Sequence, residues 1–130
     1  MKRTFLMLAP LALSACVTPG TPAPPPDASG LAYARLGETV AVGGLRVTPL
    51  RLIEDSRCPQ GVQCVWAGRV RISATISTPT MKLTRDLTLG EPFAVADGTL
   101  TLAEVRPLKP KDAVIAPSDY RFGFRFDGGL

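Results

Sequence analysis

The sequence predicts an all-β domain, a small antiparallel sandwich or barrel of about seven to eight short strands. Three observations support this fold class. Apolar and polar residues alternate in several short runs, glycine and proline turn signals separate the runs at intervals of roughly 10 to 15 residues, and no segment longer than about ten residues has a helical period. The alternation alone does not distinguish a sandwich from a barrel.

The clearest strand signal is the run GRVRISATIS at residues 68–77. Its apolar side chains occupy every second position, with arginine, serine and threonine between them. Successive side chains of a strand point to opposite faces, so this spacing predicts a strand with one buried face. The predicted core residues of this run are Val70, Ile72, Ala74 and Ile76.

Three other runs alternate less regularly. In LRVTPLRLIED, residues 45–55, the apolar phase shifts at Pro49, which predicts a bulge or an edge position. A second phase shift falls between Leu102 and Val105 in GTLTLAEVRPL, and Arg85 occupies an apolar-phase position in MKLTRDLTLG. We expect a strand in each run, with a local irregularity at these positions.

The last run, DYRFGFRF at residues 119–126, has an aromatic side chain at every second position. Aromatic residues make up only 6% of the chain, too few to line a large apolar cup and also fill a core. We therefore predict that this row belongs to the final core strand rather than to a ligand platform. The row consists of Tyr120, Phe122, Phe124 and Phe126.

The N-terminus has the features of a targeting signal. Lys2 and Arg3 precede an apolar stretch at residues 5–13, which is too short for a membrane-spanning helix of about 20 residues. A chain of 130 residues is the size of one ordinary domain. The predicted organisation is a signal peptide over residues 1–15, a lipidated cysteine with a proline-rich linker over 16–30, and one β-domain over 31–130.

The four residues Leu13-Ser14-Ala15-Cys16 resemble the lipobox of bacterial lipoproteins. This resemblance implies cleavage before Cys16, a diacylglyceryl group on its thiol and an acyl chain such as palmitate on the new amino terminus. Val17 stands where an aspartate would favour the inner membrane, which implies the outer membrane with the domain facing the periplasm. The alternative is an ordinary signal peptide that leaves Cys16 as a free thiol.

The linker and the charge balance narrow the range of partners. Residues 17–30 are rich in proline, glycine, serine and threonine, a composition that predicts an extended tether. Loss of the signal peptide leaves 13 basic and 11 acidic residues. Because this balance is close to neutral and no basic run interleaves with aromatic residues, we expect no nucleic acid partner.

Residues 54–68, EDSRCPQGVQCVWAG, contain two of the three cysteines. With Cys16 assigned to the lipid anchor and the compartment oxidising, Cys58 and Cys64 form an even pair that predicts a disulfide. A redox pair usually has two intervening residues rather than the five found here, and a metal site would need further soft ligands that a chain without histidine lacks. We expect a structural disulfide, no metal and no cofactor.

The local sequence also predicts how the disulfide closes. Pro59 and Gly61 fit the second and fourth positions of a type I turn, which would fold the chain back and bring the sulfurs together. If the following residues are extended, Trp66 lies on the same side as Cys64. The indole is then expected to cover the bridge.

Catalysis is not expected from this chain. Without histidine there is no Ser-His or Cys-His pair. Glu54 and Asp55 are adjacent, so on a strand their carboxylates point to opposite faces and do not form a catalytic pair. We expect Asp55 to accept a hydrogen bond from Arg57 or to cap the turn.

The exposed residues around the predicted Cys58–Cys64 disulfide, together with the strand that follows them, form a candidate interaction surface. Arginines at positions 69 and 71, with Arg121 and Arg125, would give a basic sheet face suited to anionic headgroups or a partner protein, although a solvated outer face explains them equally well. The candidate surface residues are Arg57, Gln60, Gln63, Trp66, Arg69 and Arg71.

One motif within this stretch resembles a known group. The residues Asp55-Ser56-Arg57-Cys58-Pro59, Gly61-Val62, Cys64 and Trp66-Ala67-Gly68 resemble the hallmark of a group of small bacterial secreted proteins and lipoproteins. The resemblance covers about a tenth of the chain. It implies a secreted β-domain with a disulfide and transfers no catalytic residue.

These observations together predict a non-catalytic envelope lipoprotein that acts as a binding or interaction module. It would be held at the membrane through Cys16 and would contact an envelope protein or an anionic surface. The alternative is a small-ligand carrier, with its site at a barrel mouth or beside the Cys58 to Cys64 loop.

Overall fold

The computed structural model describes residues 30–128. The predicted signal peptide, the lipidation site at Cys16 and nearly all of the predicted linker lie outside the described residues. Among residues 30–128, no helix has the length and apolar character that a transmembrane span requires.

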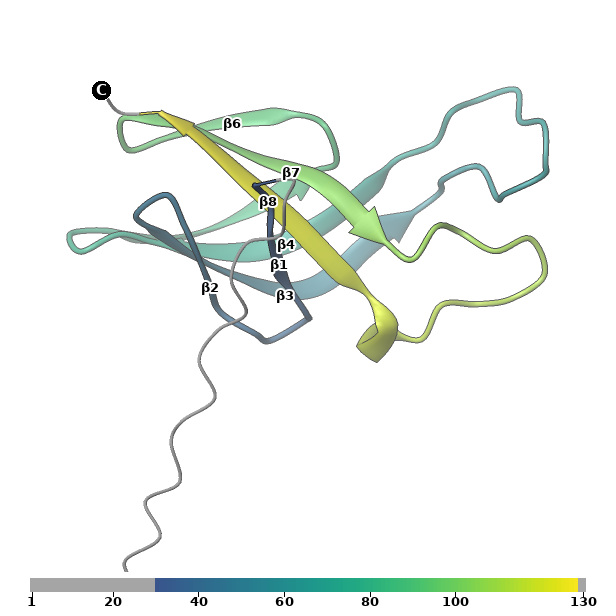
Figure 1. The fold of residues 1–130 in the computed structure, drawn as a ribbon, viewed down its shortest axis with the longest axis horizontal. Coiled ribbons are helices and arrows are strands. Elements are labelled where there is room, and N and C mark those ends of the chain that lie inside the picture. Colours follow the sequence, from purple (N-terminus) through teal and green to yellow (C-terminus); the bar gives the residue numbers. More distant parts are fainter. Residues whose placement is uncertain (1–29, 129–130) are drawn as a thin grey trace, which may run out of the picture.

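The chain forms two four-stranded antiparallel sheets (Figure 1). In the first, the strand order is β2 (Val40–Val42), β3 (Leu45–Asp55), β4 (Val70–Ser77) and β5 (Lys82–Thr88). In the second, the order is β1 (Ala32–Ala34), β8 (Arg121–Gly128), β7 (Gly98–Arg106) and β6 (Pro92–Val95). A short 3-10 helix, η1 (Pro117–Asp119), precedes β8. The all-β prediction is confirmed, and the two open sheets correspond to the sandwich rather than to a closed barrel.

The core consists of apolar side chains from both sheets. The predicted alternation in β4 is confirmed, because its four apolar residues are fully buried. The aromatic row of β8 is confirmed as a core strand, with Phe122 and Phe124 fully buried, Tyr120 4% exposed and Phe126 packed at the margin. From β7, Leu100 and Leu102 complete the centre of the core.

Both predicted phase shifts correspond to bulges. In β3 the pairing with β4 shifts between Pro49 and Arg51 and again between Leu52 and Glu54. The extra residues, Leu50 and Ile53, are 46% and 37% exposed. This is expected for a bulge, in which two residues of one strand lie opposite a single residue of the neighbouring strand. The β7 ladder shifts between Leu102 and Glu104, which restores Val105 to the core.

Arg85 interrupts the apolar alternation of β5, and the position of this strand at an edge of the sheet explains why a charge is tolerated there. It pairs with buried Ala74 of β4, yet its side chain is exposed. Since β5 is the edge strand of its sheet, a long charged side chain there reaches water around the edge. An inward-pointing charge on an edge strand also opposes pairing with another chain.

Two loops project from the same end of the sandwich (Figure 1). The β3–β4 loop spans residues 56–69, and the β7–η1 loop spans residues 107–116. The β2–β3, β4–β5 and β6–β7 turns lie at the opposite end (Figure 1), because they join the other ends of β3, β4 and β7, the strands that reach the two loops. The motif-bearing stretch therefore lies entirely at one end of the domain.

Candidate functional site

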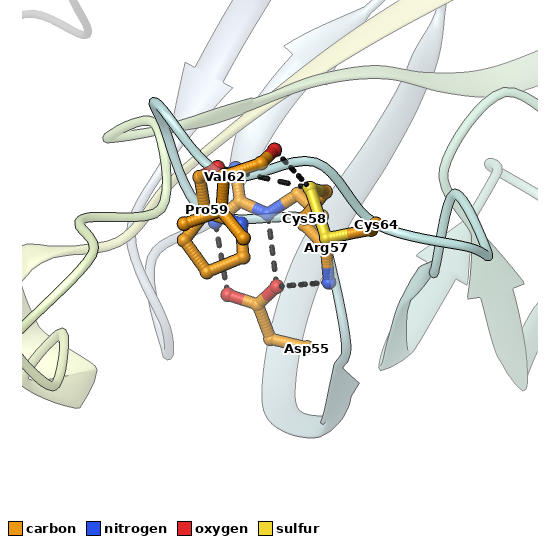
Figure 2. The surroundings of a disulfide bond; sticks show 6 residues. All are labelled: Asp55, Arg57, Cys58, Pro59, Val62 and Cys64. Atoms are coloured by element: carbon orange, nitrogen blue, oxygen red, sulfur yellow. Dashed lines mark hydrogen bonds and ion pairs between the residues drawn. A yellow bond between two sulfur atoms is a disulfide. The ribbon is translucent and has the colours of Figure 1, made fainter.

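The predicted disulfide between Cys58 and Cys64 is present in the β3–β4 loop (Figure 2). The two Cα atoms are 5.9 Å apart. The Sγ atom of Cys58 also lies 3.0 Å from the carbonyl oxygen of Val62. The bridge thus closes a compact loop that carries no regular secondary structure of its own.

The turn inside the loop begins one residue later than predicted. The amide of Val62 donates to the carbonyl of Pro59 at 3.3 Å, so Pro59 is the first residue of the turn and Gly61 the third. Gly61 has φ of 74°. A positive φ at the third position is typical of a type II turn, in which glycine is favoured because it has no Cβ. The expected type I turn over residues 58–61 is therefore wrong.

Asp55 and Arg57 form a two-pronged ion pair at the base of the loop (Figure 2). Nε and Nη2 of Arg57 each donate to a different carboxylate oxygen of Asp55 at 2.9 Å. The side chains are only 14% and 6% exposed. Nη1 of Arg57 also donates to the carbonyls of Val105 and Pro107, both at 3.1 Å. One guanidinium therefore ties the end of β3 to the end of β7 in the other sheet.

Three further contacts connect the end of β3 and the β3–β4 loop to the β7–η1 loop and the start of β8. The hydroxyl of Tyr120 donates to Asp55 Oδ2 at 2.7 Å, and Nζ of Lys109 donates to the backbone carbonyl of Asp55 at 3.0 Å. The amide of Gln60 donates to the carbonyl of Lys109 at 3.0 Å. We call Asp55, Arg57 and Tyr120 the clasp. Sequence reasoning anticipated its Asp55–Arg57 contact but missed Tyr120, which is 65 positions away in the chain.

The clasp shifts the ionisation of its members. Burial raises the pKa of the Asp55 carboxyl, but hydrogen bonds from Arg57 and Tyr120 outweigh it and lower the pKa to about 2. Burial, together with the hydrogen bond to the Asp55 carboxylate, raises the pKa of Tyr120 to about 12. The hydrogen bond to Asp55 likewise raises the pKa of Arg57. The clasp is therefore ionised as an Asp–Arg pair across the physiological range.

Ser56, Arg69 and Gly68 form the stem of the loop. The amide of Ser56 donates to the carbonyl of Arg69 at 2.8 Å, and the amide of Arg69 donates to Ser56 Oγ at 2.9 Å. Gly68 has φ of 67°, and a Cβ there would collide with the backbone carbonyl of Ser56. These motif residues are explained by the closure of the loop.

Five large apolar residues of the two loops face solvent. In the β3–β4 loop Val65 is 90% exposed and Trp66 is 83% exposed. The indole does not cover the disulfide as expected, because residues 65 and 66 lie in a bend rather than in an extended segment. Val62 of the same loop, and Leu108 and Val114 of the β7–η1 loop, are also exposed. We call these five side chains the apolar end: Val62, Val65, Trp66, Leu108 and Val114.

Sequence reasoning missed the contribution of the β7–η1 loop to this surface. The available signal was that Leu108 lies among prolines and charged residues, and that Val114 lies in a four-residue apolar run, 113–116, bounded by Asp112 and Pro117 and without alternation. Such positions have no strand to bury them. They are 65% and 97% exposed.

The candidate surface residues do not form one surface. Gln60, Gln63 and Trp66 are exposed on the loop, but Arg57 is enclosed in the clasp. Nε of Arg69 pairs with Glu54 at 2.6 Å, which lowers the pKa of that carboxyl, and Arg71 pairs with Asp86 at 3.4 Å.

The four arginines considered for a basic face are also separated. Arg71 lies in β4 and Arg69 just before it, whereas Arg121 and Arg125 lie in β8 of the other sheet. Outward-facing residues of the two sheets of a sandwich point in opposite directions. Arg125 additionally pairs with Asp127 at 2.9 Å. The structure does not assemble a single basic face from these residues.

Within residues 30–128, no group of three or more His, Cys, Asp or Glu side chains is placed to hold a metal ion, and every buried side-chain nitrogen or oxygen has a hydrogen-bond partner. Two open depressions lie beside the β7–η1 loop. One of about 710 Å³ is bordered by Arg106, Leu108 and Arg121, and one of about 350 Å³ by Asp55, Val114 and Tyr120.

Comparison with known proteins identified no relative of this chain. No family model matches the chain, and neither a curated protein nor a solved structure shows significant similarity to it.

Proposed function

We propose that this protein is a lipid-anchored binding domain of the bacterial envelope, without catalytic activity, that contacts its partner through the apolar end. The observation that carries the proposal is the exposure of Val65 and Trp66 on a loop that is fixed at its base. Large apolar side chains scattered singly over a surface are normal. Within residues 30–128, five of the eight exposed large apolar residues lie on two adjoining loops.

The rigidity of the loop supports a binding role. The disulfide, the clasp and the stem each restrict residues 56–69. Ordering a flexible loop on binding costs free energy, so a loop that is already fixed presents its side chains at lower cost. Tryptophan is among the residues that most often dominate binding interfaces. A fixed loop with an exposed tryptophan is therefore suited to recognition.

The polar groups of the site support a binding role rather than a catalytic one. The carboxylate of Asp55 accepts from both Arg57 and Tyr120, and all three guanidinium nitrogens of Arg57 donate within the fold. These groups hold the loops together and are committed to that contact. The chain also has no histidine to act as a general base at neutral pH.

The anchor is tested separately from the binding surface. If Cys16 carries the lipid, the intact mass of the mature protein includes the acyl chains, and the protein fractionates with outer membranes. Cys16→Ala should abolish both properties. A wild-type protein that is soluble and unmodified would refute the anchor while leaving the apolar end to be tested on its own.

The binding surface is tested by photo-crosslinking in cells. A photoreactive amino acid replaces Val65 at the apolar end or, as a matched control, exposed Asp97 in the β6–β7 turn at the opposite end. We expect reproducible adducts to an envelope component from position 65 and none from position 97. Equal yields at both positions, or no adduct from position 65, would refute the proposal.

The second candidate function is that of a small-ligand carrier. The depression of about 350 Å³ beside Tyr120 is bordered by apolar Leu52, Ala113, Val114 and Ile115, and it adjoins the disulfide loop. If the protein is a carrier, native mass spectrometry of protein purified from cells should show a retained small molecule. Val114→Asp should then release it, whereas Met81→Asp at the opposite end should not.

A further inference from the structure

We infer that the apolar end inserts into the headgroup region of a phospholipid bilayer. This inference rests on the proposed function and names the partner of that surface. The partner would be the membrane that holds the lipid anchor, so that the domain is attached to it at two points.

The composition of the loop favours a lipid surface. Residues 58–68 contain no charged side chain, and two of their apolar side chains are almost fully exposed. A charged group is costly to bring into a bilayer, so a loop that enters one must be free of charge at its tip. The backbone of an irregular loop also has polar groups that hydrocarbon cannot satisfy, which limits entry to the headgroup region.

Trp66 is the residue type best suited to that depth. Indole has an apolar body with one hydrogen-bond donor, and tryptophan is enriched where a membrane meets water. Leu108 and Val114 stand on the second loop at the same end. Three apolar contacts from two loops that are joined by the clasp would hold the domain in one orientation.

The lysines at this end of the domain lie on the β7–η1 loop, between Leu108 and Val114, whereas residues 58–68 of the β3–β4 loop carry no charge. Lys109 and Lys111 follow Leu108 in the β7–η1 loop, where Asp112 is the one opposing charge. Lys109 is held at the base of the loops by its bond to the Asp55 carbonyl. Basic side chains just outside an inserted segment are attracted by anionic headgroups. The uncharged β3–β4 loop, with two lysines on the neighbouring loop, therefore fits an anionic bilayer.

The predicted linker is long enough for both attachments to reach one membrane. Residues 17–30 would span about 40 Å at the polyproline rise of about 3.1 Å per residue. The longest strand, β3 with 11 residues, is about 36 Å long. Because the linker joins the domain at β1 and would be about as long as the longest strand, it would leave the domain room to turn its apolar end towards the bilayer. Tethering would also raise the effective concentration of the loops at that surface.

The single tryptophan of the chain makes the inference directly measurable, since Trp66 is the only one and lies at the surface in question. The mature protein is incorporated into vesicles of phosphatidylethanolamine and phosphatidylglycerol in a 3:1 ratio, with acyl chains either plain or brominated near the headgroup. We expect the Trp66 emission to shift to shorter wavelength and to lose most of its intensity in the brominated vesicles.

Two matched variants identify the surface responsible. Val65→Asp places a charge at the tip, where 90% exposure in the free protein makes it harmless to the fold. It should abolish both the shift and the quenching. Met81→Asp makes the same kind of change in the β4–β5 turn at the opposite end, where Met81 is 42% exposed. This variant should behave as wild type.

The outcomes separate this inference from the proposed function. Unshifted and unquenched Trp66 emission would overturn the membrane contact, and a protein adduct at position 65 in cells would then identify a protein partner and leave the binding function standing. If the purified protein carries no lipid, it is mixed with the same vesicles and measured in the same way. Failure of the anchor therefore does not prevent the test.

Discussion

The guanidinium of Arg57 and the carboxylate of Asp55 face each other as a two-pronged ion pair, with both nitrogen to oxygen distances at 2.9 Å. The pair is local, because a single serine separates the two residues, and it fixes the guanidinium where it can reach the second segment. The remaining nitrogen of Arg57 reaches the carbonyls of Val105 and Pro107. The pair is important for stability because it connects segments about 50 positions apart.

Arg57→Ala is expected to lower the free energy of unfolding by about 3 kcal/mol, because the buried Asp55 carboxylate loses its charged partner and two backbone carbonyls lose their donor. Urea unfolding measures this loss. Arg69→Ala provides the matched control, since its ion pair with Glu54 is exposed and exposed pairs contribute little. Equal shifts of the urea midpoint in the two variants would contradict the role assigned to the clasp.

Acidification is expected to destabilise the protein over a defined range. The pKa of Asp55 is about 2 in the folded protein against 3.8 ordinarily, so the unfolded chain takes up the proton first. The stabilisation is fully present above about pH 4 and is lost as the pH falls towards 2. Asp55→Asn should reduce the slope of stability against pH in this range. An unchanged slope would show that other carboxylates produce it.

Gly68→Ala and Gly61→Ala should differ although both glycines have positive φ. At Gly61 a Cβ meets nothing within 4 Å, so the expected cost is the conformational one of about 1 kcal/mol. At Gly68 the Cβ would collide with the Ser56 carbonyl, and the stem must open to relieve the collision. Thermal unfolding should show a clearly larger loss for Gly68→Ala. The reverse order would mean that the stem is not closed in solution.

Removal of the disulfide should destabilise the domain without unfolding it. Closing a loop this short stabilises by about 2 kcal/mol in the chain-entropy model. Urea unfolding of the Cys58→Ser/Cys64→Ser protein should show that loss. Alkylation without reductant should leave both cysteines of the wild-type protein unmodified, and free thiols in the mature protein would contradict the bridge.

Much of the fold could be predicted from the sequence. The alternation in residues 70–76 and the aromatic row at 120–126 identify core strands because the side-chain period of a strand is two. Interrupted alternation at Pro49 and between Leu102 and Val105 identified the bulges for the same reason. The site was less predictable. The turn was displaced by one residue, and Trp66 was placed over the bridge because an extended chain was assumed where the chain bends.

By itself, the sequence determined local properties: the five longer strands (β3, β4, β5, β7 and β8), most of the residues that they bury, and that Cys58 and Cys64 pair. The short strands β1, β2 and β6 were not identified. Periodicity and turn chemistry act between near neighbours, so they are readable along the chain. Only the tertiary structure decided which distant residues meet. It placed Arg57 and Tyr120 on Asp55, divided the four arginines between two sheets, and brought Leu108 and Val114 to the same end as Trp66. Alternation tells which face of a strand a residue occupies but not which strands share a sheet, because that depends on how the loops connect them.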